Sequence, residues 1–124
     1  MSENKKKFDI RKRSFDYALR AIKLFQHVDE EKSGAGKIIG KQFLRSATSV
    51  GAQVEEAQAS ESQPDFIHKM SIACKEARES LYWLRLLETS EIISKTRLHS
   101  IIQETDEIIA VLTSIIKNTK STKT

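Results

Sequence analysis

Carboxylate pairs at helical spacing are the feature of this sequence that comes nearest to a catalytic centre. Glu-x-x-Glu motifs stand at residues 76–79 and 104–107, and in a helix each of these would place both carboxylates on one face. Di-iron sites in four-helix bundles use such carboxylates together with Glu-x-x-His motifs. None of the three histidines follows a glutamate by three residues, so we expect no metal and no other cofactor.

Nucleophilic catalysis and phosphate-binding loops have equally little support. Cys74, the single cysteine, stands at the border of an apolar stripe through Met70 and Ala77, where a thiol usually acts as a small hydrophobic side chain. The glycines of segment 34–36 precede Lys37, but their spacing matches neither a Walker loop nor a dinucleotide-binding turn. We therefore expect a protein that is not an enzyme.

Polar side chains run beside the apolar stripes of two predicted helices, in segments 46–56 and 76–85. They recur at three- and four-residue steps, the spacing of one helix face. A buried carboxylate needs a cationic partner, so we expect Arg45 to pair with Glu79 or Glu56. The set is consistent with an intrachain polar network, a subunit interface or a ligand site. Its candidate residues are Arg45, Ser46, Ser49, Glu56, Glu76, Arg78, Glu79, Tyr82, Trp83 and Arg85.

Positive charge is concentrated at the two ends of the chain. The formal net charge is +4, yet residues 1–13 hold six lysines and arginines against two acids, and residues 117–124 hold three lysines. Residues 14–116 therefore sum to −3. Basic ends can neutralise phosphates without reading bases, although lysine-rich termini can also serve solubility alone. The candidate nucleic-acid-binding residues are Lys5, Lys6, Lys7, Arg11, Lys12, Arg13, Lys117, Lys120 and Lys123.

Arginines and aromatic side chains share a face of the third predicted helix. Arg78, Tyr82 and Arg85 lie at helical spacing, and Trp83 adjoins them. Aromatic rings between arginines stack on nucleobases in some proteins, and the same residue types are enriched in protein interfaces. Because the central part of the chain is slightly acidic, we favour the interface interpretation for this face.

Four periodic apolar segments predict the architecture. The 124 residues include only 4 glycines and 1 proline, too few for the many turns of an all-β protein. Apolar residues recur at three- and four-residue steps in four segments of similar length. This pattern predicts an all-α, antiparallel up-down-up-down four-helix bundle, flanked by flexible basic tails at 1–8 and 119–124. The expected helices are 9–31, 37–59, 64–88 and 91–118.

Individual residues make the predicted packing specific. Ser62 and Ser90 are the expected N-caps of the third and fourth helices. The apolar stripe of the first helix is expected to run through Phe15, Ala18, Ile22, Phe25 and Val28. The third and fourth helices carry apolar residues on additional faces, which predicts a cyclic homo-oligomer. These additional residues are Tyr82, Trp83, Ile102, Ile109 and Ile116.

The cysteine content and the apolar runs bear on the cellular compartment. A lone cysteine cannot form an intrachain disulfide, which favours a reducing environment. No apolar run approaches the roughly 18 residues of a membrane-spanning helix, and the N-terminal residues are charged. We expect a cytoplasmic protein without membrane contact.

Two blocks of sequence resemble a known family. Residues 43–57, FLRSATSVGAQVEEA, resemble the second-helix signature of the bacterial four helix bundle family, the 23S rRNA-intervening-sequence proteins, and residues 65–87 resemble its third-helix signature. The resemblance extends over nearly the whole chain. It implies an antiparallel four-helix bundle, a ring-shaped homopentamer and no catalytic residues. The accessory variability proteins of diversity-generating retroelements, which act with a reverse transcriptase and nucleic acid, are similar in fold and assembly.

These observations lead to two hypotheses about function. The first is a non-catalytic oligomeric scaffold that binds nucleic acid, RNA or DNA and preferably RNA, through basic tails and surfaces. Five-fold assembly would multiply the charge of each end and strengthen weak phosphate contacts. The alternative is a protein-interaction module that docks a partner enzyme such as a reverse transcriptase.

Overall fold

In the part of the chain that the structure describes, four helices follow one another along the sequence. The computed structural model describes the backbone of residues 3–31 and 34–122, and the side chains of residues 10–28 and 34–122. Within these residues there is no strand. The all-α four-helix bundle predicted from the sequence is therefore confirmed. The helices are α1 (Glu3–Glu31), α2 (Ala35–Ala57), α3 (Gln63–Thr89) and α4 (Lys95–Ser121).

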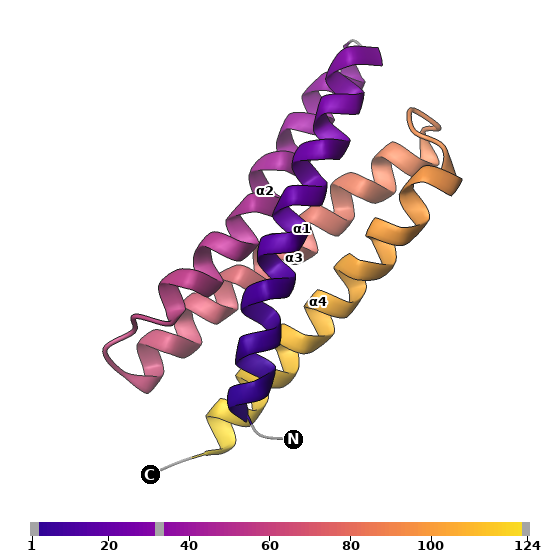
Figure 1. Cartoon of the computed structure of the whole chain (residues 1–124). Helices are drawn as coiled ribbons and strands as arrows, with labels where there is room; N and C mark the ends of the chain where they lie inside the picture. The colour runs from indigo at the N-terminus through magenta and orange to yellow at the C-terminus, as the bar shows by residue number, and fades with distance from the viewer. Residues whose placement is uncertain (1–2, 32–33, 123–124) are drawn as a thin grey trace.

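Successive helices run in opposite directions, so the start of α1 and the end of α4 lie at the same end of the bundle (Figure 1). Each helix packs against the next one along the chain, and α1 packs against α4 to close the bundle. The α1–α4 contact is the smallest of the four.

The outer helices extend further into the basic ends than the apolar pattern predicts. α1 begins at Glu3, whereas the pattern predicts a start at residue 9, and α4 ends at Ser121 rather than at residue 118. Glutamate and lysine have high helix propensity, so a helix can continue through them without apolar partners. Apolar periodicity reports packing, not helix ends. The residues assigned to tails at 3–8 and 119–121 are therefore helical.

The connection between α3 and α4 falls later than the sequence suggests. The side chain of Ser62 accepts a hydrogen bond from the Asp65 amide and caps α3, as expected. α4, however, is capped by Ser94, and Ser90 instead ends α3. Glu91 between them has φ 62°, a left-handed conformation that breaks the helix. A serine can cap either helix terminus, and the backbone turn at Glu91 decides which one it caps.

The buried face of α1 includes Val28 of the predicted stripe but not Phe15 or Ile22. Ile10, Tyr17 and Ala21 are almost completely buried, whereas the side chains of Phe15 and Ile22 are 64% and 40% exposed. α1 carries two adjacent apolar rows, and the row through Tyr17 and Ala21 faces the bundle, where α2 approaches closely. A Cβ atom on Gly51 of α2 would lie 3.1 Å from the Ser14 carbonyl oxygen.

The additional apolar residues on α3 and α4 are mostly covered within the chain. Trp83, Ile102, Ile109 and Ile116 are half-buried and pack against the core. Tyr82 alone of this group is largely exposed, at 57%. The sequence predicts exposed apolar residues on α3 and α4. In the described structure the exposed large apolar residues lie mainly on α1 instead.

Candidate nucleic-acid interface

Arg13 joins α1 to α4 through the second Glu-x-x-Glu motif. Its Nη2 donates hydrogen bonds to Glu104 at 2.7 Å and to Glu107 at 2.8 Å, and its Nε donates to Glu104 at 3.1 Å. The hydrogen bond to Glu104 raises the pKa of Arg13 above its ordinary value, although burial opposes this effect. The guanidinium charge is thus neutralised within the chain. This motif is a structural clamp between two helices.

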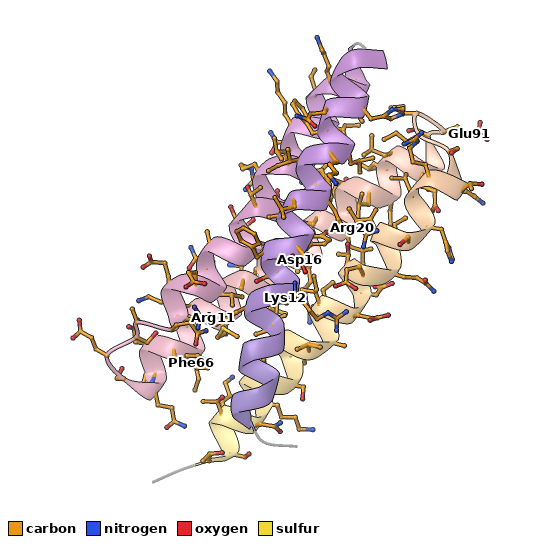
Figure 2. All side chains as sticks on the ribbon, in the orientation of Figure 1. Arg11, Lys12, Asp16, Arg20, Phe66 and Glu91 are labelled. Carbon is orange, nitrogen blue, oxygen red and sulfur yellow. The ribbon has the colours of Figure 1, made fainter. Side chains whose placement is uncertain are left out.

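The other described cations of the N-terminal cluster are also paired within the chain. Arg11 donates to Glu55 of α2 at 2.9 Å, and Lys12 forms an ion pair with Asp16, one turn further along α1, at 3.0 Å. Figure 2 shows Arg11, Lys12 and Asp16 along the first half of α1. Exposed pairs of this kind are weak, but they place a carboxylate beside each cation. A nucleic-acid phosphate would have to compete with that carboxylate.

Four of the remaining predicted cations, Lys5, Lys6, Lys7 and Lys123, have side chains outside the described residues. Lys117 and Lys120 lie exposed near the end of α4. Of the nine candidates, these two are the described cations that form no ion pair with another described residue.

Arg45 anchors the polar network between α2 and α3. Its guanidinium forms ion pairs with Glu79 and, at 3.4 Å, with Glu76, so Glu79 rather than Glu56 is the partner among the two expected. The indole Nε1 of Trp83 donates to the same Glu79 carboxylate at 2.9 Å. Glu79 is therefore held from two sides. The first Glu-x-x-Glu motif, like the second, serves to bind an arginine.

Two serine hydroxyls form the buried part of this network. Ser46 and Ser80 are fully buried, and their hydroxyl oxygens are 2.9 Å apart across the α2–α3 contact. Ser49 is half-buried, and its hydroxyl donates to the Arg45 carbonyl within its own helix. Glu56 is exposed. Ser46 therefore reaches α3, whereas Ser49 does not.

A groove of about 450 Å³ lies between α3 and α4. Its floor is formed by apolar and small polar side chains, and its rim is basic. No acidic side chain lines it, and none of its four exposed cations forms an ion pair within the described part of the chain. We call this the basic groove. Its lining residues are Ser71, Cys74, Lys75, Arg78, Thr113, Ile116, Lys117 and Lys120.

A second hollow, of about 430 Å³, continues the basic groove along α3. Arg78 lines both, and Tyr82 and Arg85 line the second hollow, together with Leu81, Leu86 and Thr89. The Tyr82 ring stands edge-to-face with Trp83, at a centroid separation of 5.1 Å and an interplanar angle of 67°. We call this the aromatic hollow.

The sequence analysis does not identify Lys75 as a site residue, nor does it place the cations of α3 and α4 opposite each other. Lys75 and Arg78, like Lys117 and Lys120, are three residues apart and so share a helix face. Two cations three residues apart in a predicted helix therefore indicate a basic helix face. The register that sets Cys74 opposite Thr113, with Sγ and Oγ1 3.7 Å apart, brings the two pairs together.

Two negative findings concern the described residues. No group of three or more histidine, cysteine, aspartate or glutamate side chains is placed to hold a metal ion there. None of the helices in that part of the chain is long and apolar enough to cross a membrane. Cys74 is buried and contacts Thr113.

The arrangement defines a class: an all-α antiparallel four-helix bundle with a basic groove between its last two helices. The chain belongs to the family of 23S rRNA-intervening sequence proteins, whose model matches residues 6–114. A solved structure from Bacteroides thetaiotaomicron VPI-5482, described as a protein of unknown function from the S23 ribosomal protein family, is similar, with a TM-score of 0.83 and 38% identity. The similarity covers 90% of this chain and 98% of that one. No curated protein matches the chain.

Proposed function

We propose that this protein is a non-catalytic scaffold that binds nucleic acid, RNA in the first place, and that the basic groove is its phosphate-binding surface. The main support is one observation: the cations that line the groove have no carboxylate partner among the described residues. Such cations attract phosphate and release its counterions on binding.

This proposal moves the main contact from the chain ends to the body of the bundle. Carboxylate partners already neutralise Arg11, Lys12 and Arg13, so these cations would contribute less to the binding free energy of a phosphate. Lys117 and Lys120 keep their proposed role, now as one wall of the groove. The cations on α3 supply the other wall.

Charge reversal in the groove tests the proposal. The variant Lys75→Glu with Lys117→Glu should bind labelled RNA at least about tenfold more weakly at about 0.1 M salt, as measured by fluorescence anisotropy. The slope of log affinity against log salt should flatten by about 0.7 for each lost contact to a single strand. Lys41→Glu with Lys95→Glu is the matched control, because it changes net charge equally at exposed sites outside the groove. Equal losses in both variants would refute a specific groove.

We also propose that the chain assembles into a ring-shaped homopentamer, as the family resemblance implies. Phe15, Leu19 and Ile22 support self-association, because they form one face of α1 and are 64%, 46% and 40% exposed. A five-membered ring joins two different faces of neighbouring subunits, so the α1 face would pack against another surface of the next copy.

The same apolar face supports the second candidate, a module that docks a partner enzyme such as a reverse transcriptase. Light scattering separates the two. A mass five times that of the 14.1 kDa chain, reduced to the monomer mass by Leu19→Glu, is the result expected if the face joins subunits. A monomer at micromolar concentration would contradict the pentamer and favour docking of a different protein.

A further inference from the structure

We propose that the aromatic hollow stacks an unpaired nucleobase on Tyr82, so that the ligand class of this protein is single-stranded rather than fully paired nucleic acid. This inference rests on the proposed function and adds the choice of strand state. It starts from the exposure of Tyr82, whose side chain is 57% accessible on a surface lined by Arg78 and Arg85.

The neighbouring contacts hold Tyr82 ready for stacking. Its ring packs edge-to-face on Trp83, and Trp83 is fixed by the 2.9 Å hydrogen bond from its indole nitrogen to Glu79. Glu79 is itself fixed by Arg45. The chain of contacts therefore runs from α2 through Glu79 to the ring of Tyr82. A platform that is ordered before binding loses little side-chain entropy when a base stacks on it.

The same contacts neutralise the carboxylate of Glu79. Glu79 is the acidic residue one turn before Trp83, and its carboxylate is engaged by Arg45 and by the Trp83 indole. Arg78 and Arg85 lie one turn before and nearly one turn after Tyr82 on the same face, and neither pairs with a described residue. Phosphates on either side of a stacked base would meet these two arginines.

The position of the hollow relative to the basic groove selects the strand state. Arg78 lines both, so a strand whose phosphates follow the groove is led to Tyr82. In a duplex the base faces are covered by neighbouring base pairs, and a side chain at the surface cannot stack on them. Unpaired bases offer their faces freely, and stacking on an aromatic side chain tolerates any sequence.

Trp83 makes this inference measurable, because it is the only tryptophan of the chain and touches Tyr82. Short oligoadenylate should bind more tightly than a fully paired RNA duplex of the same length, and should change Trp83 fluorescence where the duplex does not. Tyr82→Ala should weaken oligoadenylate binding about 5- to 100-fold and leave duplex binding unchanged. Tyr82→Phe, which keeps the ring, should bind as the parent does. Ile38→Ala, at another exposed apolar side chain, is the matched control.

The outcomes separate this inference from the proposed function. If groove variants weaken RNA binding but Tyr82→Ala weakens neither ligand, or weakens both equally, the groove stands and base stacking is refuted. If the intact protein binds neither RNA, both are refuted. A Tyr82→Ala variant that keeps RNA affinity and loses its oligomeric state would assign the ring to a subunit contact and overturn the inference. Because Tyr82 is exposed, its replacement should leave the thermal melt unchanged.

Discussion

At the scale of single residues, the α2–α3 contact depends on the small size of Ser46 and Ser80. Each hydroxyl oxygen also lies within hydrogen-bond distance of a carbonyl oxygen of its own helix, Ser46 of Phe43 and Ser80 of Glu76. Two hydroxyls carry two protons, so two of these three contacts are hydrogen bonds at once, and both polar groups have a partner in the core. The helices can approach closely because no larger side chain separates them.

Ser46→Leu should lower the free energy of unfolding by about 1–3 kcal/mol, because the added carbons have no space between the helices. Ser49→Leu is the matched control, since Ser49 is half-buried and bonds only within α2; its effect should stay within about 0.5 kcal/mol. Urea unfolding monitored by circular dichroism measures both. Equal destabilisation by the two variants would contradict the placement of α2.

Sequence alone could predict that Arg45 pairs with Glu79 or Glu56, but it could not predict that the N-terminal cations are paired within the chain. Arg45 and Glu79 lie on successive helices whose phases both follow from their apolar stripes. Arg13 meets Glu104, 91 positions later, across a contact whose register depends on which face of α1 is buried. Until that face is known, a cluster of cations looks free for phosphate when it is already paired.

At the scale of elements, Tyr17 joins α1 to α4 from within the core. Its hydroxyl lies 2.7 Å from that of Thr105, and Thr105 donates its own proton to the Ile101 carbonyl, so Tyr17 is the donor. Burial raises the pKa of Tyr17 from 10.0 to about 12, because the ionised ring would lose its hydration.

This pKa shift predicts a loss of stability in alkali. Below about pH 10 Tyr17 is neutral in both states and its contribution is complete; above it, the unfolded chain loses the proton first, which favours unfolding. Between about pH 10 and pH 12 the free energy of unfolding should fall by about 2–3 kcal/mol from this group. Tyr17→Phe should lose less stability over the same range in urea titrations. Parallel curves for the two proteins would contradict the burial of Tyr17.

The two faces of α1 show where element-level prediction stops. The row through Phe15 and Ile22 and the row through Tyr17 and Ala21 both have helical spacing, and the larger apolar residues favour the wrong one. The decision comes from the fit to α2, because Gly51 of α2 lies close to the α1 backbone at Ser14. Such fit between two helices is a property of the pair, which the sequence of one helix does not contain.

At the scale of the whole molecule, net charge is a poor guide to where an anion binds. Residues 14–116 sum to −3, yet they include Lys75 and Arg78 of the basic groove. Many acidic side chains of this segment form ion pairs elsewhere, so they do not neutralise the groove. The bundle topology then sets these cations opposite Lys117 and Lys120. The sequence predicted the helices that carry the site, and the antiparallel register of α3 and α4 created it.

Lysine footprinting tests the central claim, that the basic groove binds nucleic acid, most directly. The protein is acetylated with and without single-stranded RNA, and the modification of each lysine is read by mass spectrometry. Lys75, Lys117 and Lys120 should be protected by RNA, whereas Lys41 and Lys95, which are exposed outside the groove, should react equally in both samples. Protection confined to the lysines of residues 1–13, with those of the groove fully reactive, would contradict the proposed site.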